Sequence, residues 1–204
     1  MTGPHPSLVA LRQAFVDHAV AYAPDIQAFC GAMLADDLPA IEVTPQRGPA
    51  MALIDDLVAE TCAATHPIVD AVKHASGHVA WRQSYTIEDP GFDADYLQNY
   101  GWFNLIAPSG PFVSDTMRLS VGYWGQGLSY PRHWHAPEEI YLVLAGRAVF
   151  MSEGRAEVDG GPGATIAHDS NQPHAIRMPD APLLAAAFWR GPQLEATSGL
   201  EGRS

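Results

Sequence analysis

The hydrophobic pattern of this chain changes near residue 75, and this change limits the folds open to it. In residues 7–35 apolar side chains recur at three- and four-residue steps, and Pro24 divides the segment at a point where proline fits a first helical turn. A Pro/Gly-rich linker at 38–49 precedes a further stretch of helical spacing, 51–74, which Pro67 breaks or kinks. The N-terminal third therefore predicts amphipathic helices.

After residue 76 the helical spacing disappears, and short runs of β-branched and aromatic residues alternate with Gly, Pro, Asp and Asn. We predict strands at 79–87, 102–106, 117–124, 129–135, 138–144, 148–152, 164–167, 174–178 and 183–189. Short strands in such number favour a closed barrel or a sandwich, because closure removes exposed strand edges. The predicted fold is mainly β with an N-terminal helical extension. Its predicted parts are a helical region (1–75) packing on the barrel, a β-barrel (76–192) and a flexible tail (193–204).

The charge balance excludes several classes of partner. The 204 residues include 11 Lys+Arg and 23 Asp+Glu, so the net charge is −12 and a nucleic acid would be repelled. No run of 18 apolar residues predicts a membrane span, and no signal peptide is recognisable, so we expect no membrane partner and a cytoplasmic location. Cys30 and Cys62 are too few for a disulfide framework and are expected to be free thiols.

Chemistry concentrates in residues 127–146. His133 and His135 lie two apart, so on a strand both imidazoles point to one face. Beyond a bend at Ala136-Pro137, Glu139 and Tyr141 again share a face. Imidazoles and a carboxylate that converge in this way are typical ligands of a divalent first-row metal. For the third imidazole we favour His174 over His168, because Pro173 and His174 lead directly into an alternating strand. The other histidines are expected to be ordinary polar residues: His5, His18, His66, His74 and His78.

The spacing from Gly127 through His133, His135 and Glu139 to Gly146 resembles the first motif of the cupin superfamily. The second cupin motif is only loosely matched by residues 163–174. Together with the helical N-terminal half, the chain resembles the cupin-type dimethylsulfoniopropionate (DMSP) lyases through Tyr130, Tyr141 and Trp189.

This resemblance implies a cupin (double-stranded β-helix, or jelly-roll) barrel, one bound divalent metal, and cleavage of DMSP to dimethyl sulfide and acrylate. It also implies His135, Glu139 and His174 as metal ligands, with His133 or Tyr141 completing the set, and Tyr141 as the favoured base.

The chemistry of the residues is compatible with such a β-elimination. A metal that binds the substrate carboxylate would acidify the α C–H, and it would favour the phenolate of Tyr141, whose free pKa is ~10. Tyr130 is a second catalytic candidate. The zwitterionic substrate carries a sulfonium, which hydrogen bonds cannot hold but aromatic faces can. Candidate receptors are Tyr123, Trp124, Tyr130, Trp134 and Trp189. Arg132 and Arg190 can be considered as carboxylate clamps, but solvated charges are the expected role.

Two other classes of function remain open from the sequence. The same ligand set serves metal-dependent oxygenases and isomerases, which have no need of a phenol at the metal. A non-catalytic cupin that binds small molecules is the other alternative, and such a protein would gain no activity with added metal. The ligands suit Zn, Fe, Mn, Co and Ni alike, and the chain is expected to be a monomer or a homodimer.

Overall fold

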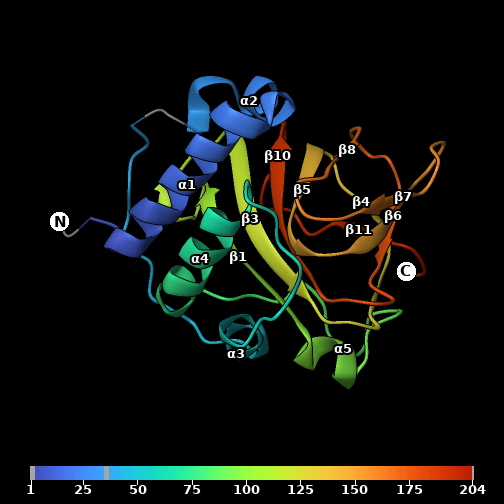
Figure 1. Ribbon diagram of the computed structural model, residues 1–204. Coiled ribbons are helices and arrows are strands. Elements are labelled where there is room, and N and C mark those ends of the chain that lie inside the picture. The colour runs from blue at the N-terminus through green and yellow to red at the C-terminus, as the bar shows by residue number, and fades with distance from the viewer. Residues whose placement is uncertain (1–2, 35–36, 204) are drawn as a thin grey trace.

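Two β-sheets lie face to face, and helices cover the outer side of the larger one (Figure 1). The structure is a computed structural model that describes residues 3–34 and 37–203. The expected helix end at Ala35 and the outermost ends of the predicted N- and C-terminal parts lie outside these ranges. The sheets have the strand orders β2-β1-β3-β10-β5-β8 and β11-β4-β9-β6-β7. This architecture confirms the mainly β prediction with an N-terminal helical part.

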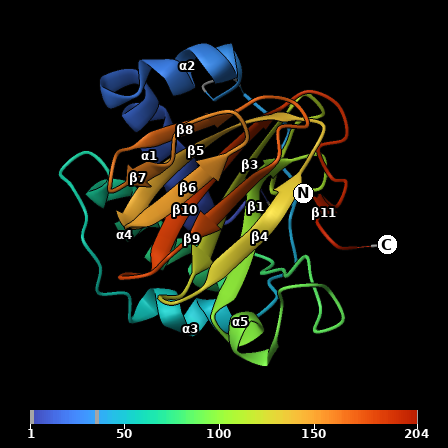
Figure 2. The same ribbon diagram turned by 90° about the vertical axis from the view of Figure 1, so that its right-hand side faces the viewer.

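The helical elements are α1 (Pro6–Tyr22), α2 (Pro24–Cys30), η1 (Gly31–Leu34), α3 (Pro49–Asp55), α4 (His66–Ala75), η2 (Ser76–His78) and α5 (Ala94–Gln98). The strands are β1 (Tyr100–Ala107), β2 (Phe112–Val113), β3 (Met117–Trp124), β4 (Ser129–Trp134), β5 (Glu138–Gly146), β6 (Ala148–Ser152), β7 (Val158–Gly160), β8 (Thr165–His168), β9 (His174–Arg177), β10 (Leu183–Arg190) and β11 (Gly199–Leu200). Figure 2 shows β6, β9 and β4 side by side in front of the larger sheet.

Prolines begin the helices, as the sequence predicts. Pro6 and Pro24 occupy the first turns of α1 and α2, where the missing N–H has no helical partner to lose. The prediction of a helical stretch over 51–74 that Pro67 breaks or kinks is wrong in the position of the break, because α3 ends at Asp55 and α4 starts at His66, eleven residues further on. Pro67 lies in the first turn of α4 and does not interrupt a longer helix. Val58, in the intervening segment, is 94% exposed, so its apolar side chain contributes no buried helical face.

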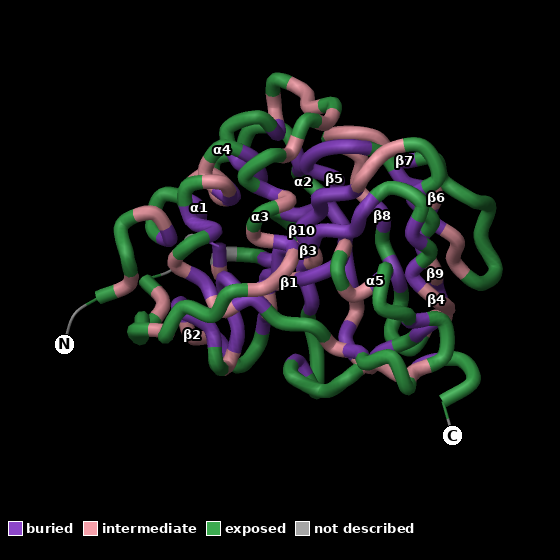
Figure 3. The backbone as a smooth tube through the Cα atoms, turned by 90° about the horizontal axis from the view of Figure 1, so that it is seen from below, coloured by how far each residue is buried: buried purple, intermediate pink, exposed green. Residues whose placement is uncertain are grey.

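Strict alternation along β5 divides the interior into two clusters. Ile140, Leu142 and Leu144 pack toward the helices, together with α1 and α4 side chains. Tyr141 and Val143 point into the barrel. Both faces of β5 are buried, and its sequence is therefore a nearly continuous apolar run. Glu139 and Tyr141 lie on its inner face. Figure 3 shows the buried central strands enclosed by exposed loops.

Three local predictions differ from the structure. Residues 79–87 form only isolated bridges, Gln46 with Ala80 and Arg82 with Trp102, because a turn begins at Thr86, whose N–H donates to Asp89. The segment expected to be a flexible tail contains β11, which pairs with β4, and its Leu200 is buried. Helix α5 was not predicted, although Asp93 is a sequence signal for its start: the Asp93 carboxylate accepts the Tyr96 N–H at 2.7 Å.

Gly146, which closes the first motif, is required by its backbone. Its φ is +77°, and a Cβ there would collide with the backbone carbonyl of Pro182. We expect Gly146→Ala to lower the free energy of unfolding by about 2–4 kcal/mol, measured by chemical denaturation. Gly154→Ala is the matched control, because its φ is +75° but nothing lies within 4 Å of its Cβ position. An equal loss in the two variants would contradict the collision and leave only the φ penalty.

Candidate active site

Three imidazoles converge inside the barrel. Strands β4 and β9 pair so that His133 lies directly opposite His174, and His135 follows two residues along the same face. Their rings are close, with centroids 4.1 Å apart for His133 and His174 and 5.1 Å for His135 and His174. All three are buried, and one nitrogen from each lies within 4.8 Å of the others. Beyond the Ala136-Pro137 bend, Glu139 and Tyr141 line the same cavity as His133, so the residues before and after the bend face inward together.

Backbone carbonyls fix the orientation of each ring. The Nδ1 atoms of His133, His135 and His174 lie 2.8, 2.9 and 2.8 Å from the carbonyl oxygens of Pro131, Pro137 and Gln172. Each Nδ1 therefore donates its hydrogen to the carbonyl, which directs Nε2 inward, where it can bind a metal ion once it is unprotonated. Orientation of this kind is typical of metal-binding histidines.

Glu139 completes the cluster from β5. Its Oε2 lies 3.3 Å from the Nε2 atoms of both His135 and His174, and its Oε1 accepts a 2.6 Å hydrogen bond from the indole Nε1 of Trp189. Burial alone would raise the pKa of Glu139, but the neighbouring imidazoles of His135 and His174 outweigh it and hold the pKa well below its usual range. The cluster therefore contains a buried carboxylate in its ionised form.

His168 also belongs to this cluster, although the sequence favoured His174 over it. Its ring stacks on His174 with centroids 4.0 Å apart, and it faces Glu139 across the β5–β8 ladder. Its Nδ1 lies 3.1 Å from the hydroxyl of Ser152. Burial, together with His174, lowers the pKa of His168 to about 3. The strand register, which places His168 beside Glu139, could not be read from the sequence.

The residues present fit a divalent metal ion. Nε2 of His174 and Nε2 of His168 are buried and have no hydrogen-bond partner among the described residues. Burial and the neighbouring His174 lower the pKa of His133, so this imidazole is neutral and can donate its lone pair. Unsatisfied buried nitrogens beside an ionised carboxylate are costly unless a cation binds them. Two sets of side chains can hold such an ion: His133 with His135 and His174, or Glu139 with His168 and His174.

Tyr141 is buried on the inner face of β5, two residues after Glu139. Burial and the Glu139 carboxylate raise its pKa well above the ordinary value, so the phenol is protonated when no cation is near. Tyr130 is likewise buried, and its hydroxyl lies 3.0 Å from that of Tyr85. Burial raises its pKa as well. Both predicted tyrosines therefore lie in the site.

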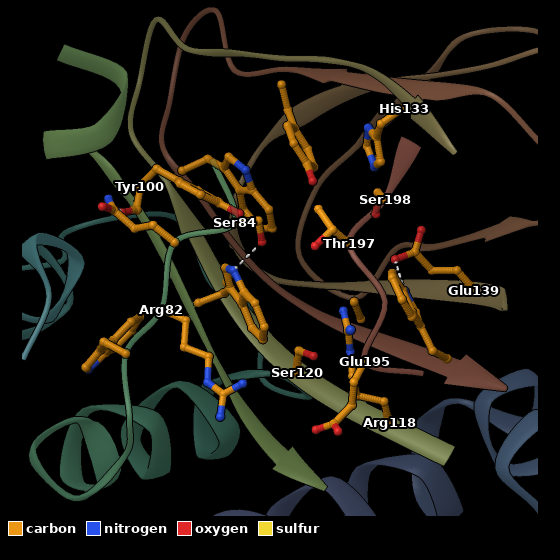
Figure 4. Close-up of a pocket in the computed structure, with 18 of the residues that line it drawn as sticks. Arg82, Ser84, Tyr100, Arg118, Ser120, His133, Glu139, Glu195, Thr197 and Ser198 are labelled. Atoms are coloured by element: carbon orange, nitrogen blue, oxygen red, sulfur yellow. Dashed lines mark hydrogen bonds between the residues drawn. The ribbon is translucent and has the colours of Figure 1, made fainter. Parts of the chain in front are cut away.

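A cavity of about 660 Å³ adjoins the cluster and is lined by His133, Glu139 and Tyr141. Figure 4 shows His133 and Glu139 on one side of it and Tyr100 on the other. A group of aromatic rings extends from Tyr100 to the histidine cluster, where the Tyr130 ring centroid lies 4.1 Å from that of His133. The Tyr100, Trp124 and Tyr130 ring centroids lie 5.7 to 6.2 Å apart in pairs. Tyr100 and Tyr85 were not among the predicted residues, because nothing in the sequence pairs their segments with the motif.

The structure separates the remaining aromatic candidates. Tyr123 was predicted to contact the substrate but packs with the helix-side cluster, because successive β3 residues alternate in direction and Trp124 takes the inner face. Trp134 lies on the outer face of β4, between His133 and His135, and is 37% exposed. Trp189 lines the cavity, but its ring packs against the His135 ring at 4.1 Å and under the Arg118 guanidinium at 3.6 Å.

The charged candidates and the other histidines lie away from the cluster. Arg132 pairs with Glu153 and Arg190 with Glu138, both with partly exposed side chains, as expected of solvated charges. The five other histidines lie in or near the helical segments, and each contacts a neighbouring group there: His5, His18, His66, His74 and His78. Cys30 and Cys62 are free thiols. Among the described residues, we find no helix with the length and hydrophobicity needed to cross a bilayer.

A buried cluster of imidazoles and a carboxylate inside this barrel defines a cupin with a site suited to a metal ion. Residues 26–185 match the dimethylsulfoniopropionate lyase family, and the chain belongs to that family. It is 39% identical over 158 residues to the dimethylsulfoniopropionate lyase DddQ of Ruegeria pomeroyi, a match that covers 78% of each chain.

Solved structures give the same result over nearly the whole chain. The crystal structure of DMSP lyase DddQ from Ruegeria pomeroyi matches with a TM-score of 0.87 and 36% identity, covering 97% of this chain and 99% of that one. A crystal structure described with the DMSP lyases RdDddP and RnDddQII matches with a TM-score of 0.89 and 34% identity, covering 96% and 97%.

Proposed function

We propose that this chain is a metal-dependent carbon–sulfur lyase that cleaves DMSP to dimethyl sulfide and acrylate by β-elimination. The observation that carries the proposal is the position of Tyr141. A buried phenol lines the same cavity as the imidazole and carboxylate cluster, in a chain that belongs to the DMSP lyase family. An elimination needs a base beside the substrate carboxylate, whereas an oxygenase has no need of a phenol there.

His133, His135, His174 and Glu139 are the proposed metal ligands. Donors of this kind suit Zn, Fe, Mn, Co and Ni, and the identity of the ion does not alter the roles of the residues. A bound divalent cation would act as a Lewis acid on the substrate carboxylate and would favour the phenolate of Tyr141. Tyr141 is the alternative to His133 as the fourth ligand, beside His135, Glu139 and His174.

The proton and the electron pairs can then be followed through the reaction. The phenolate oxygen of Tyr141 takes the proton from the carbon next to the carboxylate. The C–H electron pair forms the new carbon–carbon double bond, and the bond from the β carbon to sulfur breaks with its electrons passing to sulfur. Acrylate and neutral dimethyl sulfide leave, and the phenol of Tyr141 is left protonated.

Tyr100, Trp124 and Tyr130 are the proposed receptor for the sulfonium. The three rings line the cavity next to one another, and each cation–π contact contributes ~0.5–2 kcal/mol. We propose a different role for Trp189, whose ring is packed against His135 and Arg118: its indole N–H orients Glu139. Tyr130 binds the substrate and stays protonated, because burial raises its pKa.

The test of the function is a headspace assay for dimethyl sulfide with purified, metal-loaded protein and DMSP. Stoichiometric release of dimethyl sulfide and acrylate is the expected result. The absence of dimethyl sulfide with each of Zn, Fe, Mn, Co and Ni would reject the lyase proposal. Bound metal without turnover of DMSP would then leave another cupin activity or a binding function.

Trp189→Phe tests the orientation of Glu139. The variant keeps an aromatic ring but loses the 2.6 Å hydrogen bond to Glu139 Oε1. Loss of such an outer hydrogen bond typically weakens metal binding by ~10–100-fold, and we expect a shift of this size in a competitive chelator titration. Trp134→Phe, on the outer face of β4, is the control and should leave the metal affinity unchanged. Unchanged affinity in Trp189→Phe would contradict the assigned role.

A further inference from the structure

The side chain of Arg118 projects into the cavity from the inner face of β3. Its guanidinium carbon lies 3.6 Å from the Trp189 ring centroid and 5.3 Å from that of Trp102. One Nη donates to the carbonyl oxygen of Leu194 at 2.8 Å. The packing against aromatic rings and the hydrogen bond hold the planar guanidinium in one orientation, with its other donors free. Figure 4 shows Arg118 on the same side of the cavity as Glu139.

The positive charge of Arg118 has no anionic partner in contact. Six arginines with partly exposed side chains form ion pairs: Arg132, Arg147, Arg155, Arg177, Arg190 and Arg203. Within the part of the chain that the structure describes, no carboxylate forms an ion pair with Arg118, and its Nε is buried without a hydrogen-bond partner. Burial lowers the pKa of Arg118, and the Glu139 carboxylate nearby opposes that shift. An unpaired, partly buried cation with a free donor is a receptor for an anion.

We propose that Arg118 is a specificity-determining residue that binds the carboxylate of the substrate; this inference rests on the proposed lyase function. The guanidinium would donate to the carboxylate from the Nη that does not bind Leu194, and the packed, planar guanidinium fixes the direction of this donor in a way that the flexible ammonium of lysine does not. The substrate would then lie with its carboxylate toward Arg118 and the metal cluster and its sulfonium toward the rings of Tyr100, Trp124 and Tyr130.

The charges around the cavity favour such a residue. The chain carries a net charge of −12, and Glu139 and Glu195 line the same cavity, so an incoming carboxylate meets repulsion. Arg82 is the other cationic residue in the described lining, but its side chain is exposed. A partly buried guanidinium retains more of its attraction for an anion than an exposed one, because water screens it less. Arg118 is therefore favoured over Arg82.

Two small probes separate the carboxylate from the sulfonium. Acrylate carries the carboxylate alone, and trimethylsulfonium carries the sulfonium alone. We would measure the binding of both to the metal-loaded protein by calorimetry, and kcat and KM for DMSP, in the parent protein, Arg118→Met and Arg118→Lys. Arg82→Met is the matched control, because it removes a cation from the same cavity lining.

Arg118→Met is expected to weaken acrylate binding by ~10–100-fold, the loss of a charge-assisted hydrogen bond. KM for DMSP should rise by a similar factor with a smaller change in kcat, while trimethylsulfonium binding and metal content stay as in the parent. Arg118→Lys should recover part of the affinity, and Arg82→Met should change it less than threefold. Arg118→Lys, which keeps the charge and most of the packing, also serves if Arg118→Met does not fold.

Two results would overturn the inference: acrylate bound equally well by the parent and by both Arg118 variants, or acrylate and trimethylsulfonium weakened together, which would show a structural role. Failure of the lyase proposal looks different. In that case the parent releases no dimethyl sulfide, whereas the dependence of acrylate binding on Arg118 would still identify a carboxylate receptor.

Discussion

Tyr141→Phe is expected to lower kcat for DMSP cleavage by ~10²–10⁴-fold, the contribution typical of a positioned general base. The ring of Tyr141 is packed inside the barrel among the side chains of the inner cluster, so phenylalanine fills the same space. Only the hydroxyl is lost, and with it the group that accepts the proton. KM should change little if Tyr141 is not needed for binding, and steady-state kinetics with dimethyl sulfide detection measure both constants.

Tyr130→Phe is the matched comparison, because it also removes one buried hydroxyl from the same cavity. That hydroxyl lies 3.0 Å from the hydroxyl of Tyr85. The ring centroids of Tyr130 and His133 lie 4.1 Å apart. We expect its main effect on KM, because the ring that faces the sulfonium remains but its orientation loosens. Full activity in Tyr141→Phe would reject this residue as the base. A larger loss of kcat in Tyr130→Phe than in Tyr141→Phe would exchange the two roles.

Removal of the metal by a strong chelator is expected to reduce the activity by ~10²–10⁴-fold, since Lewis-acid stabilisation by a bound cation supplies several kcal/mol and each 1.36 kcal/mol is a factor of ten. One equivalent of a divalent ion should restore it. The chelated protein should also melt at a lower temperature, because Glu139 and the unsatisfied imidazole nitrogens are then buried without a cation. Metal analysis and thermal melts measure both effects.

The ligands can be tested one at a time. His135→Ala and Glu139→Gln should each lose stoichiometric metal, and His66→Ala, which removes an exposed histidine of α4, should retain it. His168→Ala compares the two possible ligand sets, since His168 belongs to the set with Glu139 and His174. Activity that survives exhaustive chelation and is unaffected by His135→Ala would contradict the metal-dependent mechanism.

The candidate site was predictable where local spacing decides direction. The two-residue step from His133 to His135 and from Glu139 to Tyr141 fixes which side chains share a strand face, and the structure has them on the inner face of the barrel. The same rule separates Tyr123 from Trp124, and applying it to β3 would have removed Tyr123 from the substrate contacts. The prediction for residues 51–74 was wrong, because apolar side chains at helical spacing do not reveal where a helix ends.

Contacts between distant segments needed the structure. His168 approaches Glu139 through the β5–β8 register, and Trp189 reaches it from β10. Tyr85 comes from a segment without regular strand structure and meets Tyr130 across 45 positions of sequence. None of these pairings follows from the periodicity of either partner.

The sequence by itself determined the helix-then-strand organisation and the family, because periodicity and motif spacing depend only on neighbouring residues. It also identified the imidazoles and the carboxylate of one motif. The tertiary structure decided which further groups join them: the pairing of strands brought in His168, Trp189 and Arg118. Strand register and sheet closure depend on packing across the whole barrel, so the charge and the shape of the cavity are properties of the folded chain alone.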